Sequence, residues 1–118
     1  MTAYGIAHLR PTGAPSEEVL EYLERIQDTL DPFGGKFLVH GNEIEVVEGE
    51  WPGALVMIGF PSLDVAREWY ASAAYQEILH LRADHIPGDL ILVDGCGPDH
   101  DSAAMAAELR AAQLTRPA

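Results

Sequence analysis

FPSLDVAREWYASAAYQEILHLR, residues 60–82, carries the clearest folding signal of the chain. It predicts the end of a strand, a short helix, a break at Ser72 and a second helix, because apolar residues recur with the helical period of 3.6 on both sides of the break. In the second helix, one stripe at i, i+3, i+4 and i+7 holds Tyr75, Ile78, Leu79 and Arg82. We expect this stripe to form an apolar floor with a phenol at one end and a guanidinium at the other.

Strand candidates and one further helix surround this stretch. Ser16 is a good N-cap for a helix that Asp31-Pro32 ends. Its apolar stripe consists of Val19, Tyr22, Leu23, Ile26 and Leu30. Gly41-Asn42 suits a tight hairpin turn between two of the strands. The strand candidates are residues 3–10, 36–40, 44–48, 54–60 and 89–94.

The order of these elements is that of a ferredoxin-like, split β-α-β fold in the α+β class. We expect a four-stranded antiparallel sheet plus a short final strand, with the helices on one face. Residues 54–60 are almost continuously apolar, which is typical of a central strand covered on both faces. The second sheet face would be bare and apolar, and a symmetric homodimer is the commonest way to cover such a face. The expected partner is therefore a second copy of the chain.

The charge of the chain excludes several classes of partner. Its 118 residues include 7 Lys and Arg against 19 Asp and Glu, a formal net charge of −12. Nucleic acids and anionic membrane surfaces need clustered basic residues, so neither is expected as a partner.

No apolar run approaches the ~20 residues of a membrane helix, and the N-terminus lacks a signal-peptide pattern. Cys96 is the single cysteine, so no intrachain disulfide can form, and this fits the reducing cytoplasm. Together these observations lead us to expect a soluble cytoplasmic protein.

The composition changes after Gly95. Residues 1–95 predict the ferredoxin-like domain, and residues 96–118 predict a linker and a C-terminal helical tail. The many alanines of the tail favour a helix, but its apolar stripe is limited to Met105, Leu109 and alanines. We therefore expect the tail to be dispensable for the fold of the domain.

Several short motifs occur together in this chain. They are Gly34-Gly35-Lys36-Phe37-Leu38-Val39-His40, Glu48-Gly49-Glu50-Trp51, Phe60-Pro61-Ser62, Ala66, Trp69-Tyr70, Ser72, Tyr75-Gln76 and Arg82. As a set they resemble the domain of unknown function 1330 family, a branch of the dimeric α/β-barrel superfamily, over about residues 1–94. The resemblance implies the ferredoxin-like fold and a homodimer whose two sheets close into a barrel. It implies no particular reaction.

One position departs from that family pattern. Many members carry Glu immediately before the Phe that ends the fourth predicted strand, and this chain has Gly59 there. If the carboxylate serves chemistry in the relatives, this chain lacks it. Gly59 would then open space for a ligand or for packing.

Five residues are candidates for a ligand site between sheet and helices: His40, Glu48, Trp51, Tyr75 and Arg82. His40 and Glu48 end two strands that are expected to pair, so they could bind a ligand or move a proton, or form a polar hairpin rim. Trp51 could contact a ligand or the partner chain. Arg82 could hold the carboxylate of a small organic acid, or it could snorkel or pair with a nearby acid such as Glu48 or Asp94.

We expect no metal and no cofactor. His80 and His85 are five residues apart and do not share a helix face as a zinc-binding pair does. Related barrel families, by analogy of fold alone, include cofactor-free enzymes acting on small organic molecules. The sequence therefore predicts a protein that binds or transforms a small organic molecule in a pocket without a cofactor. The alternative is a non-catalytic dimeric binding or interaction module, which a solid, side-chain-filled interior would favour.

Overall fold

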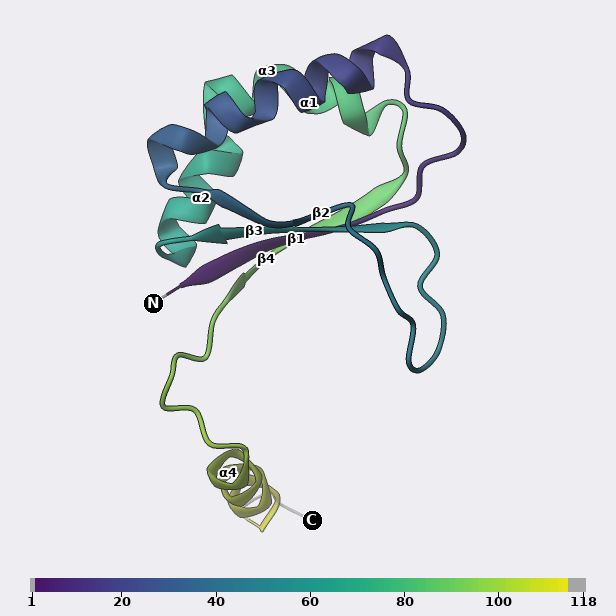
Figure 1. Cartoon of the computed structure of the whole chain (residues 1–118). Coiled ribbons are helices and arrows are strands. Elements are labelled where there is room, and N and C mark those ends of the chain that lie inside the picture. The colour runs from purple at the N-terminus through teal and green to yellow at the C-terminus, as the bar shows by residue number, and fades with distance from the viewer. Residues whose placement is uncertain (1, 115–118) are drawn as a thin grey trace.

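The structure, a computed structural model, describes residues 2–114 and has an antiparallel sheet of four strands at its centre (Figure 1). The spatial order of the strands is β2-β3-β1-β4. Their bounds are Ala3–Leu9 for β1, Lys36–His40 for β2, Ala54–Phe60 for β3 and Gly88–Asp94 for β4. This order, with β1 and β3 in the middle, is that of a ferredoxin-like α+β fold.

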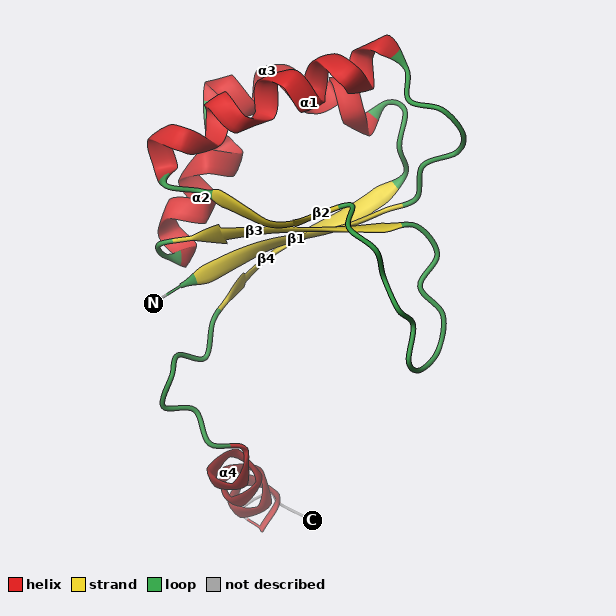
Figure 2. Cartoon of the chain, in the orientation of Figure 1, coloured by secondary structure: helices red, strands yellow, loops and turns green. Residues whose placement is uncertain are grey.

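Three helices cover one face of this sheet (Figure 2). They are α1 Glu17–Leu30, α2 Leu63–Ala71 and α3 Ala73–Ala83, and a 3₁₀ turn, η1 Asp31–Phe33, follows α1. The Ser16 hydroxyl accepts a hydrogen bond from the Val19 N–H at 3.3 Å, as an N-cap does. Ser72 ends α2 and caps α3 through the Tyr75 N–H, also at 3.3 Å. The predicted break at Ser72 is therefore confirmed.

Alternation along β1 separates the two faces of the sheet. Its odd-numbered residues Ala3, Gly5 and Ala7 are buried under the helices, while Tyr4 and Ile6 face the opposite side. Small residues on the helix side let the helices approach the sheet closely. The register continues this division across the sheet, since Ile6 lies opposite Met57 of β3 and Ile91 of β4.

The predicted strand at residues 44–48 is wrong. Residues 41–53 form a loop that extends from the sheet on the side away from α1–α3 (Figure 1). β2 is an edge strand that pairs with β3, from Lys36 opposite Gly59 to His40 opposite Val56, and residues 44–48 do not return along its other edge. At the end of β2, the Asn42 side chain accepts the His40 N–H at 2.9 Å, and the Gly41 N–H donates to the Leu55 carbonyl of β3 at 3.0 Å. Strand β4, which was expected as a short addition, is a full member of the sheet.

The core lies between the sheet and the three helices. Its largest fully buried side chains are Trp69, Tyr75, Phe60, Leu30 and Ile78. The Trp69 indole N–H donates to the Thr29 hydroxyl at 3.1 Å, so the one polar atom of this ring is satisfied. The expectation that both faces of β3 are covered holds on the helix side of this chain, where Ile58 and Phe60 are buried.

Helix α4, Ser102–Leu114, stands apart from this core. It lies on the side of the sheet opposite α1–α3, at the end of an extended segment (Figure 1). No residue of α4 in the part of the chain that the structure describes is buried. Over the same described residues, no helix is long and apolar enough to cross a membrane.

Candidate functional site

A cavity of about 70 Å³ lies between the helix side of the sheet and helices α1 and α3. Its apolar walls come from Ala7, Leu9, Val19, Leu23, Ile26, Phe37, Val56, Ile58, Trp69, Ile86 and Leu90. The remaining lining residues are His40, Arg82 and two tyrosines, Tyr22 and Tyr75. Three of the five sequence candidates, His40, Tyr75 and Arg82, are thus brought together around one cavity.

Tyr22 and Tyr75 form a buried pair of hydroxyls at this cavity. Their oxygen atoms lie 2.9 Å apart, and their rings meet edge to face at 6.2 Å. Burial, followed by the proximity of Tyr75, raises the pKa of Tyr22 far above its usual range. Tyr22 therefore remains a neutral phenol throughout the physiological range.

Arg82 supplies the only cation among the described residues that line the cavity. Its guanidinium carbon lies 5.6 Å from the centre of the Tyr22 ring, within the range of a cation–π contact. Burial opposes its charge, but the oxygens of Tyr22 and Tyr75 outweigh that effect, and the pKa of Arg82 is raised. No carboxylate within residues 2–114 lies within ion-pairing distance of Arg82, so neither Glu48 nor Asp94 is its partner.

His40 stands where the cavity meets solvent. It is an exposed residue that also lines the cavity, and its ring stacks on Phe37 with centroids 4.1 Å apart and an interplanar angle of 3°. Partial burial lowers the pKa of His40 below its ordinary value. The imidazole is therefore neutral at pH 7 and can accept a proton.

The apolar floor expected along α3 is not the surface that lines the cavity. Ile78 and Leu79 lie between Tyr75 and Arg82 along α3, but neither lines the cavity. Ile78 is fully buried in the core instead. The apolar surface beside Arg82 comes mainly from the sheet and from α1, because α3 turns only its Tyr75 and Arg82 side chains toward the cavity.

Glu48 and Trp51 do not reach this cavity. Both line a separate surface hollow within the loop at residues 41–53. Trp51 stacks on His8, with ring centroids 4.3 Å apart, and is therefore on the open face of the sheet. The predicted proximity of Glu48 to His40 depended on the hairpin that does not form.

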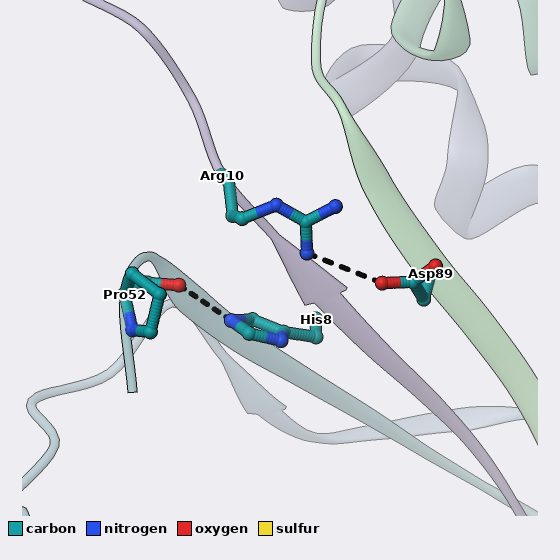
Figure 3. A network of polar contacts seen from close by, with 4 residues as sticks. All are labelled: His8, Arg10, Pro52 and Asp89. Atoms are coloured by element: carbon teal, nitrogen blue, oxygen red, sulfur yellow. Dashed lines mark hydrogen bonds and ion pairs between the residues drawn. The ribbon is translucent and has the colours of Figure 1, made fainter. Parts of the chain in front are cut away.

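His8 holds this loop against the sheet. Its ring nitrogen Nε2 hydrogen-bonds to the carbonyl oxygen of Pro52 (Figure 3). Close by, Arg10 forms an ion pair with Asp89 of β4 at 3.2 Å. His8 is thus a hydrogen-bonded structural group on the open face of the sheet.

Tyr22 lines the cavity, although the sequence pattern predicts only a packing role for it. Val19, Tyr22 and Ile26 form one apolar face of α1, and all three are buried. The signal that could have assigned Tyr22 to the site is its phenol in an otherwise aliphatic stripe, since a buried hydroxyl requires a partner.

The sequence pattern and the fold both match known proteins. Residues 2–96 match the family described as a domain of unknown function, DUF1330. The chain belongs to this family. No curated protein matches the chain.

Solved structures with little sequence identity share the fold of this DUF1330 protein. RPA0582, of unknown function, from Rhodopseudomonas palustris is 18% identical, with 82% of this chain and 84% of that chain covered and a TM-score of 0.63. A dimeric ferredoxin-like protein of unknown function from Jannaschia sp. CCS1 is 15% identical, covering 77% and 98%, with a TM-score of 0.56. SnoaB, a cofactor-independent oxygenase from Streptomyces nogalater, is 10% identical, covering 85% and 98%, with a TM-score of 0.52.

Gly59, at the position where the resemblance leads us to expect a departure from the family pattern, lies in β3 opposite Tyr4. A Cβ atom there would lie 3.3 Å from the Cδ1 atom of Leu38, so the space is used for packing between β2 and β3. Tyr4 is on the open face, and Gly59 faces the same way. The position is therefore on the opposite side of the sheet from the cavity.

The part of this DUF1330 protein that the structure describes contains no group of three or more His, Cys, Asp or Glu residues arranged to hold a metal ion. The polar groups of the cavity are phenols, a guanidinium and an imidazole, and the first two are hydrogen-bond donors to an anion. The cavity is therefore suited to an oxyanion.

Proposed function

We propose that this DUF1330 protein binds a small organic acid in the cavity between the sheet and helices α1 and α3, without a metal or organic cofactor. The observation that carries the proposal is Arg82, a half-buried guanidinium that lines an apolar cavity and has no carboxylate partner among residues 2–114. A buried charge is costly unless it is paired. The phenol oxygens of Tyr22 and Tyr75 interact with this guanidinium but are neutral, so a carboxylate ligand would supply the missing counter-charge.

The charge distribution supports an anion at this position. The chain has a net charge of −12, so most of its surface repels anions. Within the cavity the balance is reversed, since Arg82 is charged and no Asp or Glu lines the walls. A guanidinium can hold a carboxylate with two parallel hydrogen bonds, which a single ammonium cannot do.

The tyrosine pair supports the same ligand class. One hydroxyl must donate to the other across the 2.9 Å contact, which leaves one O–H hydrogen free for a further acceptor. Arg82 offers only donors. An acid presents acceptors to both groups, whereas a cationic amine would face a positive charge and one phenol.

We also propose that the protein is a homodimer that closes over the open sheet face. Leu38 and Ile91 on that face are each 55% exposed, and Val93 is 39% exposed. A contiguous apolar sheet face is usually covered by a partner. The dimeric ferredoxin-like structure from Jannaschia supports a second copy as that partner.

Whether the bound acid is also transformed separates an enzyme from a binding module. The cavity in the interior favours the small-molecule hypothesis over a solid dimeric interaction module. SnoaB, which has the same fold, is a cofactor-independent oxygenase, so the fold can host chemistry without a cofactor. The non-catalytic module would bind the same acid and release it unchanged.

Thermal unfolding in the presence of small carboxylic acids tests the binding proposal. A ligand at 100 times its Kd adds about 2.7 kcal/mol to the free energy of unfolding, which raises Tm by roughly 10 °C in a domain of this size. We expect acids to raise Tm in the wild type and not in Arg82→Met, which keeps the side-chain stem and removes the charge.

The matched control for this experiment is Arg67→Met. Arg67 pairs with Asp64 at 3.0 Å on the surface of α2 and does not line the cavity. It should respond to acids as the wild type does. An equal response in Arg82→Met and the wild type would contradict the proposal, as would the absence of any response to a full series of small acids.

A further inference from the structure

We propose that the cavity is a proton-transfer site that enolises a small 2-oxo acid, with His40 as the base and with Arg82 and the Tyr22–Tyr75 pair as the site for the developing enolate oxygen. This inference rests on the acid-binding function proposed above. It adds a reaction, a substrate class and a role for each polar residue of the cavity.

His40 has the properties of a general base. Its ring forms no hydrogen bond within residues 2–114, so both its nitrogen atoms are available to a ligand. Stacking on Phe37 at 4.1 Å fixes the orientation of the ring, and Phe37 lines the same cavity. The lowered pKa of His40 keeps the imidazole neutral at pH 7, which is the form that accepts a proton.

The other polar groups of the cavity form an oxyanion site. Arg82 provides a fixed positive charge, and the buried tyrosine pair retains one O–H hydrogen for donation. Because the pKa of Tyr22 is raised by burial, this phenol does not become a competing anion. Preorganised donors of this kind stabilise negative charge that develops on a carbonyl oxygen.

The ligand that matches this arrangement is a 2-oxo acid. Its carboxylate fits the guanidinium of Arg82, and its neighbouring ketone oxygen fits the free hydroxyl hydrogen. The cavity of about 70 Å³ exceeds the roughly 10–15 Å³ that a single water needs, so it is suited to a small ligand such as a three-carbon 2-oxo acid.

The reaction balances without a co-reactant. A ring nitrogen of His40 removes a proton from the carbon next to the ketone, the electrons of the C–H bond form a carbon–carbon double bond, and the electrons of the carbonyl π bond move to the oxygen. The tyrosine hydroxyl and Arg82 then stabilise this enolate oxygen. Return of the proton from the imidazolium restores the 2-oxo acid, and in D₂O the returned isotope is deuterium.

Pyruvate in D₂O is the probe that tests this reaction. Loss of the methyl proton signal in ¹H NMR measures exchange, and broadening of the same signal measures binding. We expect the wild type to catalyse exchange and His40→Gln to bind pyruvate but to exchange it about 100-fold more slowly, since general base catalysis contributes at least that much. Arg82→Met should lose both exchange and binding.

His80→Gln is the matched control. His80 is an exposed histidine of α3 that does not line the cavity, so its substitution should leave the exchange rate unchanged. Binding of pyruvate to the wild type without exchange would overturn the enolisation proposal and leave acid binding standing. Unchanged exchange in His40→Gln would overturn the role of His40, and the absence of both binding and exchange would overturn this proposal together with the binding of acids of this size.

Discussion

The hydroxyl oxygens of Tyr22 and Tyr75 lie 2.9 Å apart at the cavity, although the two residues are 53 positions apart in the chain. Tyr22 belongs to α1 and Tyr75 to α3, so their hydrogen bond joins the two helices that cover the sheet. Both side chains are buried. The pair therefore contributes to the packing of the domain and also provides the polar part of the cavity wall.

Removal of either hydroxyl should destabilise the domain, and the two losses should not be additive. Tyr22→Phe leaves the Tyr75 hydroxyl buried without its partner, which costs about 1–3 kcal/mol. Tyr75→Phe should have a similar effect for the same reason. The double variant should lose less than the sum, because neither hydroxyl then remains unpaired. Urea unfolding of the four proteins measures the coupling, and simple additivity would show that the hydrogen bond does not contribute.

The stability of the protein should fall on mild acidification, in part because of His40. The unfolded chain protonates this histidine near pH 6.5, whereas the folded protein, in which the pKa of His40 is lowered, does so only at lower pH. The unfolded state therefore binds more protons in this window, and the free energy of unfolding decreases as the pH falls through it. Urea unfolding at about pH 7.5 and at about pH 5 should show a smaller decrease for His40→Gln than for the wild type. An equal decrease in both proteins would contradict the lowered pKa.

The open sheet face should determine the oligomeric state. The wild type should sediment at about twice 12.8 kDa at micromolar concentration. Ile91→Lys places a charge on the exposed apolar face, at the edge strand β4, and should shift the protein toward the monomer. Leu20→Lys, on the helix side of the molecule and 37% exposed, is the matched control and should remain dimeric. A folded wild-type monomer would contradict the proposed barrel.

The C-terminal tail should be dispensable for the fold of the domain. Within the described residues α4 buries no side chain, and the family match ends at residue 96. The Gly95 N–H donates to the Thr2 carbonyl at 2.9 Å, and residues 95–98 lie beside Thr2 and Tyr4, so a truncation after Pro98 keeps these contacts. The Tm of the truncated protein should lie close to that of the full chain. A large decrease in Tm would mean that α4 packs on the body of the protein or on a second copy.

Much of the fold was predictable because local signals and the long-range packing agree. Ser72 separates α2 from α3 through a hydroxyl cap that its position in the sequence suggested. The turn at Gly34-Gly35 is equally well determined. Gly34 has φ 66°, and a Cβ atom on Gly35 would lie 2.8 Å from Leu30 and 2.9 Å from Phe60. Only glycine fits this close approach between α1 and the sheet.

The loop at residues 41–53 was not predictable from alternation alone. Residues 43–46 alternate polar and apolar as an edge strand does, but the His40 N–H at the end of β2 bonds to the Asn42 side chain and residues 41–53 leave the sheet. The position of Trp51 is likewise set by its contact with His8, which is distant in the sequence. The structure brings His40, Tyr75 and Arg82 to one cavity, whereas Glu48 and Trp51 line a separate hollow at the loop.

Binding of the acid at Arg82 is tested most directly by the ¹⁵N NMR signal of the Arg82 side-chain Nε–H during titration with a small carboxylic acid such as pyruvate. We expect the Arg82 signal to shift and to saturate as acid is added, while the signal of surface Arg67 moves little. The free energy of unfolding of Arg82→Met should change by no more than about 1 kcal/mol, the size of a lost cation–π contact. A titration in which Arg82 remains unchanged while Arg67 or other surface arginines shift would contradict the claim that this cavity binds the acid.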